Sequence, residues 1–413
     1  MLKNKQRKMI AAGSAAILAV SAAVSAAPQL SALTVGGDTS IVILGDSISS
    51  GYALQEGELG YYDYLADAYQ CTLANHAVSG ATTSDLLAKL NDDAVKSDVS
   101  AADLICLSIG GNDLLQPAMA YFKSLQLENE ALMDTLMRLA TEGSAETHMS
   151  NLTGQLRTPI AAAQENILTI ASTLKEMNPN AKIVFQTIYN PLEIEKPVYN
   201  GKDYSSEYKL LSNYINGQLR RLNNKIAEAA SSADNVKAAD VNAAFLGNGW
   251  VYARTLQKDV HPNALGHALI ASLVMDAVGD EKIGSDKLET LVGGMILSGD
   301  AKALPADDYA LLKKYTAAMQ KTAFGDVNGN GRIEATDSQT ALMAAGDLAF
   351  GLAPAQTLGQ LLLCDVDSNG LVDAKDAQYI LIYSGNTNSL LECTWQELTG
   401  SPYAPTYSNL TKQ

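Results

Sequence analysis

The chain has 413 residues, of which 47% are hydrophobic and 18% are charged. This balance is typical of a globular protein with two or three domains and excludes a chain that is disordered throughout. With 29 Lys and Arg against 45 Asp and Glu, the formal net charge is −16. Because excess negative charge repels phosphate groups, we expect neither nucleic acid nor a membrane surface as a partner.

The first 26 residues have the layout of a secretory signal peptide. Basic residues lie within positions 3–8, an uncharged stretch rich in Ala, Val, Ile and Leu follows, and small residues close it. We expect cleavage after Ala26 and secretion of the remainder to the extracellular space. Four cysteines do not make a disulfide scaffold in a chain of this length. Cys364 and Cys393 flank a compact C-terminal segment and could form one bridge.

Residues 38–282 alternate between short apolar runs and stretches with helical spacing. Short apolar runs predict strands at 40–44, 72–78, 103–109, 181–188 and 235–241, and those at 40–44 and 103–109 are expected to be buried. The helices predicted between and after them are 61–69, 86–90, 158–177, 206–230 and 264–278, with a less regular insertion at 115–155. This alternation predicts an α/β fold: one parallel sheet, helices on both faces, and a ligand site at the carboxyl ends of the strands.

Polar motifs stand where four of these strands end. In chain order they are Gly45-Asp46-Ser47, Gly80, Gly111-Asn112-Asp113 and Asp259-Val260-His261-Pro262. Acyl transfer needs a serine nucleophile, a histidine that accepts its proton, a group that fixes the imidazole tautomer, and donors for the oxyanion. The four motifs contain residue types for each of these roles.

The ordered motifs resemble the SGNH (GDSL) hydrolase superfamily. The resemblance implies a flavodoxin-like, three-layer α/β/α fold with Ser47 as nucleophile and His261 as base. It also implies an oxyanion hole formed by the N–H groups of Ser47 and Gly80 and the side chain of Asn112. His76 and His267 are expected to be structural, and His148 lies in the insertion with no evident partner.

The carboxylate of this set departs from the family pattern. The family usually has its acid three residues before the histidine, where this chain has Lys258. Asp259, two residues before His261, is the candidate that we favour. A backbone carbonyl could orient the imidazole instead, and Asp240 at the end of the fifth strand is a weaker candidate.

A second motif occurs twice near the C-terminus. The segment 326–331 recurs 39 residues later as 365–370, and both continue into the twelve-residue pattern of a calcium loop. The expected ligands are Asp326, Asn328, Asn330, Arg332 (backbone carbonyl), Glu334 and Asp337 in loop 326–337, and Asp365, Asp367, Asn369, Leu371 (backbone carbonyl), Asp373 and Asp376 in loop 365–376. The second loop has four carboxylates against three, so it should bind its ion more tightly if the geometry is comparable.

Each loop precedes a predicted helix, and this duplicated unit resembles a dockerin over about residues 324–386. A dockerin binds cohesin domains of extracellular multienzyme scaffolds, so the resemblance implies two structural Ca²⁺ ions and a cohesin partner. Residues 283–323 are then a helical connector, with helical signal at 306–319, and 324–413 are the small α-helical module with its tail, in which Trp395 and Tyr403 are expected to pack back.

The sequence thus predicts a secreted serine esterase attached to a scaffold. The resemblance favours acylated carbohydrate as substrate, for example acetylated plant cell-wall polysaccharide, with no cofactor in the chemistry. One alternative is a lipid or lysophospholipid esterase. The other is a non-catalytic, glycan-binding assembly protein.

Overall fold

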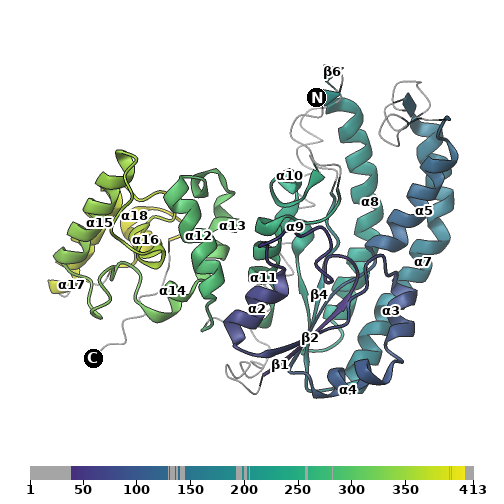
Figure 1. Ribbon diagram of the computed structural model, residues 1–413, viewed down its shortest axis with the longest axis horizontal. Coiled ribbons are helices and arrows are strands. Elements are labelled where there is room, and N and C mark those ends of the chain that lie inside the picture. Colours follow the sequence, from purple (N-terminus) through teal and green to yellow (C-terminus); the bar gives the residue numbers. More distant parts are fainter. Residues whose placement is uncertain are drawn as a thin grey trace. The chain divides into compact units, whose positions relative to one another are not determined.

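The computed structural model of the chain is shown in Figure 1. It describes residues 39–404 except 129, 131–134, 136–137, 140–144, 192–197, 200–201, 204, 256–258, 281, 390 and 392. All described residues belong to one compact unit, Leu33–Gln413. The expected signal peptide lies outside the described residues.

Five strands form one parallel sheet. They are β1 (Ser40–Gly45), β2 (Thr72–Asn75), β3 (Leu104–Ser108), β4 (Lys182–Gln186) and β7 (Val236–Ala239). The spatial order is β2-β1-β3-β4-β7, and every neighbouring pair is parallel. This is the doubly wound order of flavodoxin-like folds, so the predicted parallel α/β sheet is confirmed. Strand β2 ends at Asn75, earlier than predicted. The Asn75 side chain bonds Ser49 O and Ala77 N there, while the N–H groups of His76 and Val78 still bond Ile43 O and Gly45 O of β1.

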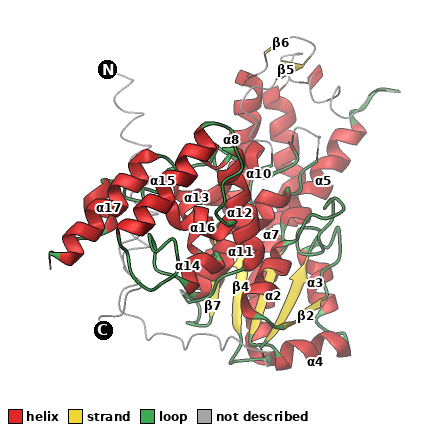
Figure 2. Cartoon of the chain, turned by 60° about the vertical axis from the view of Figure 1, so that its left-hand side comes forward, coloured by secondary structure: helices red, strands yellow, loops and turns green. Residues whose placement is uncertain are grey.

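Both faces of the sheet are covered by helices (Figure 2). In β1, Ile41 and Ile43 face one apolar cluster, whereas Val42 and Leu44 face another. The first cluster includes α2 (Tyr61–Tyr69) and α11 (Ala264–Val278). The second includes α3 (Thr83–Lys89), α4 (Asp93–Ala101), α7 (Ala145–Met177) and α8 (Ser205–Ala230). A strand buried on both faces explains why its sequence is continuously apolar.

The insertion is more helical than the sequence indicates. Helix α5 (Gly111–Ser124) begins directly after β3, and α7 begins well before the predicted start near Pro159. Buried Leu152 and Leu156 extend the apolar stripe of α7 upstream of that proline, which explains the longer helix. A short hairpin of β5 (Val198–Tyr199) and β6 (Lys202–Asp203) follows, with α9 (Val241–Phe245) and α10 (Gly249–Tyr252) after β7.

The C-terminal part of the described chain is helical. Its elements are α12 (Asp286–Ser298), η2 (Ala301–Ala303), α13 (Ala306–Lys314), α14 (Ala317–Lys321), α15 (Ala335–Ala349), α16 (Leu358–Cys364), α17 (Ala374–Asn388) and α18 (Trp395–Thr399). The single helix expected at 306–319 is two helices, because buried Tyr315 and Thr316 break it and Ser285 N–H bonds Tyr315 O. All four cysteines are free thiols, so the bridge between Cys364 and Cys393 is not formed.

The tail packs back on this helical part through Trp395, which is 1% exposed. Its ring stacks on Tyr383 at a centroid distance of 4.3 Å and contacts Phe324 edge-on at 5.9 Å. Among the described helices, none combines the length and the apolar character that crossing a bilayer requires.

Candidate functional site

The structure brings Ser47, His261 and Asp259 into one hydrogen-bonded chain. Ser47 Oγ lies 2.9 Å from His261 Nε2. On the other side of the ring, His261 Nδ1 bonds Asp259 Oδ1, which also accepts the backbone N–H of His261 at 3.0 Å. Burial raises the pKa of Asp259, but the hydrogen bonds from His261 outweigh this effect, so the net pKa is lowered. An ionised carboxylate at Nδ1 leaves Nε2 free to accept a proton from Ser47.

The turn that carries Ser47 depends on a glycine. Gly45 ends β1 with φ +111°, and a Cβ at this position would stand 1.9 Å from Ser108 O. Asp46 is buried beside it and accepts from Ser108 Oγ at 2.6 Å and from Ile48 N at 3.1 Å. Burial raises the pKa of Asp46 to about 6, although both hydrogen bonds oppose the rise. The backbone before and after Ser47 is thus fixed to β3.

The other motif residues lie at the same edge of the sheet, beyond the ends of β2 and β3. The Asn112 amide donates to Ala81 O at 3.0 Å, next to Gly80, whose φ is +82°. Asp113 accepts both the N–H and the hydroxyl of Thr83, at 2.9 and 2.7 Å. Asp113 therefore ties the start of α5 to the start of α3 and supports the turn that holds Asn112.

A tight loop allows Asp259 to reach the imidazole from only two residues away. Arg254 N–H bonds His261 O at 2.9 Å, and Asp259 N–H bonds Arg254 O at 3.1 Å. Tyr189 OH, from the segment after β4, donates to Val260 O at 2.5 Å. The Arg254 guanidinium is paired with Glu58. Sequence reasoning missed the contributions of Tyr189, Arg254 and Glu58, because these contacts join segments far apart in the chain.

The remaining candidates lie elsewhere. Asp240 accepts from Thr187 Oγ1 at 2.9 Å and from Ala243 N at 3.1 Å, which makes it the N-cap of α9. His76 pairs with Asp98, and His148 has a partner that the sequence did not indicate, the hydroxyl of Tyr121 at 2.8 Å. His267 is fully buried on α11 and accepts Tyr61 N–H, and burial lowers its pKa to about 3.

An exposed tyrosine lies against the Ser–His pair. The Tyr52 ring is 56% exposed, and its centroid lies 4.8 Å from that of His261. Its backbone N–H bonds Ser47 O at 3.0 Å. The residues on either side of it, Gly51 and Ala53, both have positive φ, at 72° and 69°. A left-handed alanine is strained, and such strain concentrates at functional positions.

The two repeated loops have the same internal hydrogen bonds. Asn330 N donates to Asp326 Oδ1 at 3.1 Å, and Asn369 N donates to Asp365 Oδ1 at the same distance. At the end of each loop, Asp337 Oδ2 and Asp376 Oδ2 accept a backbone N–H at 3.0 Å, from Glu334 and Asp373 respectively. In each loop, backbone N–H groups therefore point toward carboxylate oxygens of the same loop.

Three of the expected ligands converge in the second loop. Asp365, Asp367 and Asp376 are buried, and one carboxylate oxygen from each lies within 4.8 Å of the others. Burial raises the pKa of Asp376, and the neighbouring Asp365 raises it further; burial likewise raises the pKa of Asp367 and Asp337. Clustered oxygens of this kind fit Ca²⁺, which takes hard oxygen ligands and would neutralise the repulsion between them.

The structure thus combines a doubly wound parallel sheet with a Ser–His–Asp hydrogen-bond chain beyond its carboxyl edge. The sequence model of the GDSL-like Lipase/Acylhydrolase family matches residues 43–269, more than half of the chain. The protein therefore belongs to the GDSL-like lipase/acylhydrolase family and is an ester hydrolase by class. The uncharacterized protein YpmR of Bacillus subtilis (strain 168) is 25% identical over 248 residues, which cover 58% of this chain and 82% of YpmR.

Solved structures also match this part of the chain. A lipase from a goat rumen metagenome is 22% identical, with a TM-score of 0.40, and the match covers 58% of this chain and 97% of the lipase. An extracellular lipase from Streptomyces rimosus is 23% identical, with a TM-score of 0.41 and coverage of 58% and 99%. Phospholipase A1 from Streptomyces albidoflavus NA297 is 21% identical, with a TM-score of 0.42 and the same coverage.

Proposed function

We propose that the protein is a secreted serine esterase that deacylates carbohydrate, with Ser47 as nucleophile, His261 as base and Asp259 as its orienting carboxylate. The observation that carries this proposal is the unbroken chain from Ser47 Oγ through His261 to Asp259. In this proposal Ser47 Oγ attacks the acyl carbonyl carbon while its proton moves to His261 Nε2. The alcohol takes that proton on leaving, and a water then releases the acid from Ser47 by the reverse sequence of proton transfers.

The oxyanion of each tetrahedral intermediate needs donors that are in place before it forms. We assign them to the N–H groups of Ser47 and Gly80 and to the amide of Asn112. The Asn112 amide has two N–H bonds, and the bond to Ala81 O uses one of them. That bond fixes the amide plane, which supports a role for the second N–H as a donor to substrate.

The test is hydrolysis of acetylated xylo-oligosaccharide by the full chain, with released acetate measured directly. Ser47→Ala should abolish turnover while the circular dichroism spectrum stays unchanged. Ser50→Ala is the matched control: its hydroxyl bonds Ser79 Oγ and Ser47 O rather than His261, so most activity should remain. Activity that survives Ser47→Ala would refute the mechanism. Lysophospholipid belongs in the same panel, and its preferential hydrolysis would favour the lipid esterase instead.

Tyr52 supports the choice of a sugar substrate. An exposed aromatic ring with a fixed backbone, directly beside the imidazole, offers a flat apolar face on which a pyranose ring can stack. Tyr52→Ala should raise KM for the acetylated oligosaccharide at least about fivefold, whereas Tyr52→Phe should not. Vinyl acetate, which has no sugar, should be hydrolysed equally by all three proteins. An equal loss of kcat on both substrates would instead mean that Tyr52 supports His261.

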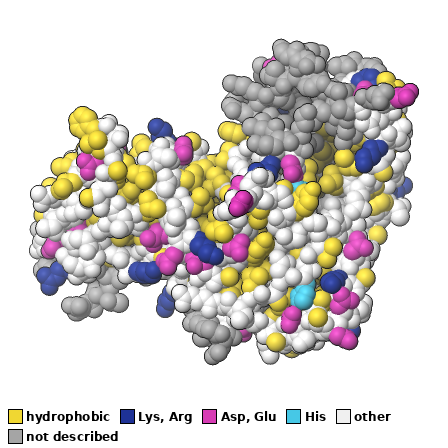
Figure 3. Space-filling model, viewed as in Figure 1, with side chains coloured by type: hydrophobic (Ala, Val, Ile, Leu, Met, Phe, Trp, Pro, Cys, Tyr) yellow, Lys and Arg dark blue, Asp and Glu magenta, His cyan; other side chains and the backbone are white. Residues whose placement is uncertain are grey.

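We also propose that residues 324–413 form a calcium-dependent module that docks on a cohesin domain of a multienzyme scaffold. Besides the loop pattern, duplicated apolar side chains support this. Leu342 and Met343 on α15 are 53% and 60% exposed, and their equivalents one repeat later on α17, Leu381 and Ile382, are 51% and 40% exposed. Apolar side chains are visible over this part of the surface in Figure 3. Exposed apolar pairs at equivalent positions are typical of a binding surface.

Binding to a panel of immobilised cohesins, with calcium and with chelator, tests this proposal. Leu342→Asp and Leu381→Asp are made separately and together, and Leu246→Asp, an exposed leucine next to α9, is the control. The double variant should lose binding, whereas the control should not. Loss in one single variant would identify one docking helix, and loss only in the double variant would indicate two alternative faces. Full binding by the double variant, or in chelator, would contradict the proposal.

A further inference from the structure

The two loops of the repeat differ in what covers them. In the first loop, residues 328–332 are all exposed. At equivalent positions of the second loop, Asp367, Ser368 and Gly370 are buried. Gly370 has φ +79°, and a Cβ there would lie 2.6 Å from the backbone of residues 301 and 302. The second loop therefore packs directly on the segment that precedes α13.

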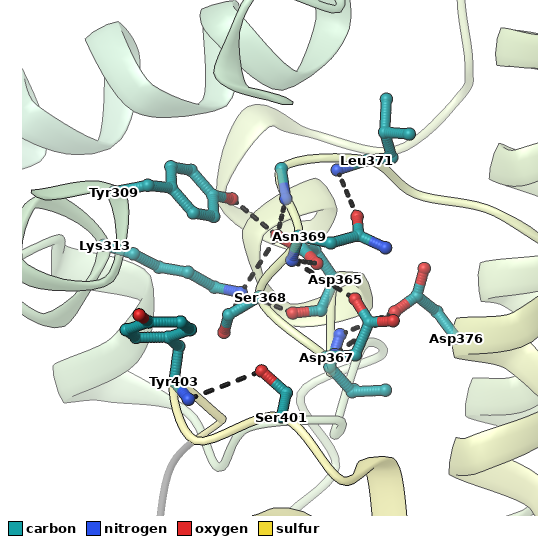
Figure 4. A network of polar contacts seen from close by, with 12 residues as sticks. Tyr309, Lys313, Asp365, Asp367, Ser368, Asn369, Leu371, Asp376, Ser401 and Tyr403 are labelled. Atoms are coloured by element: carbon teal, nitrogen blue, oxygen red, sulfur yellow. Dashed lines mark hydrogen bonds and ion pairs between the residues drawn. The ribbon is translucent and has the colours of Figure 1, made fainter. Parts of the chain in front are cut away.

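Helix α13 places a lysine against the first residue of the second loop (Figure 4). Lys313 is 2% exposed, and its Nζ lies 3.2 Å from Asp365 Oδ2. The same ammonium donates to the backbone carbonyl of Asp365 and to Ser368 Oγ at 3.3 Å. It also lies 4.5 Å from the ring centroid of Phe324, as expected for a cation. One turn earlier, Tyr309 OH donates to Asp365 Oδ2 at 2.6 Å.

The first loop has a different environment at the equivalent position. Within the described part of the chain, the hydrogen-bond partners of the Asp326 carboxylate are the backbone N–H groups of Asn330 and Gly331, and no ammonium is among them. The chain thus contains two loops of matching internal geometry, one with a lysine at its first carboxylate and one without. This difference follows from the position of α13 and not from the loop sequences.

We propose that Lys313 is a resident counter-cation of the second loop, which stabilises Asp365 without metal and competes with calcium when calcium binds. This inference rests on the proposed binding of calcium by both loops. It reverses the ranking expected from the sequence: despite its additional carboxylate, the second loop should bind calcium more weakly than the first. Calcium would then occupy the exposed loop first, and the covered loop only at higher concentration.

Two opposite effects of the α13 side chains can be separated by mutation. A fixed positive charge beside a carboxylate ligand repels a divalent cation, and this repulsion is strong where water is excluded. A hydrogen bond to a ligand orients it, and loss of such a bond typically weakens metal binding about tenfold to a hundredfold. Lys313→Met keeps most of the apolar stem and removes the charge, so calcium affinity should rise. Tyr309→Phe keeps the ring and removes the hydroxyl, so calcium affinity should fall.

The experiment is a calorimetric calcium titration of the full chain, with the second loop isolated by Asp326→Ala. Adding Lys313→Met to this variant should raise the affinity of the remaining site about tenfold or more, and adding Tyr309→Phe should lower it. In chelator, Lys313→Met should lower the melting temperature, because Asp365 loses its counter-cation. Lys314→Met is the matched control: Lys314 is on the same helix but pairs with Asp276, so calcium affinity should not change.

The possible results separate this inference from the proposal on which it rests. If the wild-type chain binds no calcium, the proposed calcium-dependent docking fails. If calcium binds and Lys313→Met leaves the affinity of the second loop unchanged or reduced, Lys313 is not a competing counter-cation. If Lys313→Met does not fold in chelator, the calcium affinities of the two loops in the chain with Lys313 intact test the inference instead. A second loop that binds calcium more tightly than the first would overturn it.

Discussion

Asp259 lies two residues before His261, and the structure shows how so short a spacing can work. The same Asp259 oxygen accepts both the ring Nδ1–H and the backbone N–H of His261. The Arg254 and Tyr189 contacts hold the loop on either side. The carboxylate is therefore fixed by the backbone as well as by the ring that it orients.

For this reason Asp259→Asn should lower kcat by orders of magnitude, because an amide can stabilise the wrong imidazole tautomer. The measurement is kcat on an acetylated sugar near neutral pH, and Asp240→Asn serves as the control because Asp240 caps α9. A loss below about tenfold, which corresponds to roughly 1.4 kcal/mol in the barrier, would show that a Ser–His dyad suffices.

Asp46 provides a prediction about pH and stability. Burial raises its pKa from the ordinary 3.8 to about 6, so the folded state holds a proton that the unfolded chain has released. The stabilisation that comes from this bound proton is therefore fully present below pH 3.8 and is lost as the pH rises to 6. This loss lowers the free energy of unfolding by roughly 3 kcal/mol. Asp46→Asn keeps an acceptor for Ser108 and Ile48 but cannot ionise.

Relative to wild type, Asp46→Asn should gain stability between pH 4 and pH 7. Urea unfolding at both values measures the difference, and subtraction of wild type removes the contributions of other titrating groups. Asp85→Asn, a change at an exposed carboxylate, should give no such gain. A variant that falls below wild type by the same amount at both pH values would show that the pKa of Asp46 is not raised in the folded protein.

Among the elements, the short helix α18 carries Trp395, whose ring contacts residues near the start and near the end of the duplicated segment. Trp395 contacts Phe324, just before the first loop, and Tyr383 on α17. Trp395→Ala should lower the free energy of unfolding by about 3–5 kcal/mol, as expected for a large buried aromatic. Trp395→Phe should cost clearly less, because the indole N–H has no hydrogen-bond partner among the residues that the structure describes. Chemical unfolding in excess calcium measures both, and a loss under about 1 kcal/mol for Trp395→Ala would mean that the tail does not stabilise the module.

The elements that could be predicted from the sequence are those with a strong local pattern. Short, mostly apolar runs predicted the five strands of the sheet, and helices 61–69 and 264–278 have the predicted bounds. Helix α16 and the break at Tyr315 were missed, because both depend on contacts between distant segments. The same limit holds for the site: the motifs predicted the chain from Ser47 to Asp259, whereas Tyr189 and Lys313 act over long sequence separations that no local pattern reveals.

At the scale of the whole molecule, the proposed reaction and the proposed calcium binding use separate residues. No loop residue is among the described hydrogen-bond partners of the Ser47, His261 and Asp259 side chains. We therefore expect a chelator to leave kcat/KM on vinyl acetate within about twofold while cohesin binding is lost. Readdition of calcium should restore binding. Loss of hydrolysis that calcium restores would show that the loops control the active site.

Helix α13 contacts both the part that carries the proposed active site and the second repeated loop. On one side Asp308 accepts from Tyr252 of α10, and on the other Lys313 and Tyr309 hold Asp365. A flexible Pro/Thr-rich linker would let an enzyme move freely around its attachment point, and proteases could cleave it. A packed helix allows no such movement and offers no such cleavage site. An engineer who transplants the loops onto another enzyme should therefore include residues 283–323, because a graft that begins at residue 324 would leave Asp365 without its lysine.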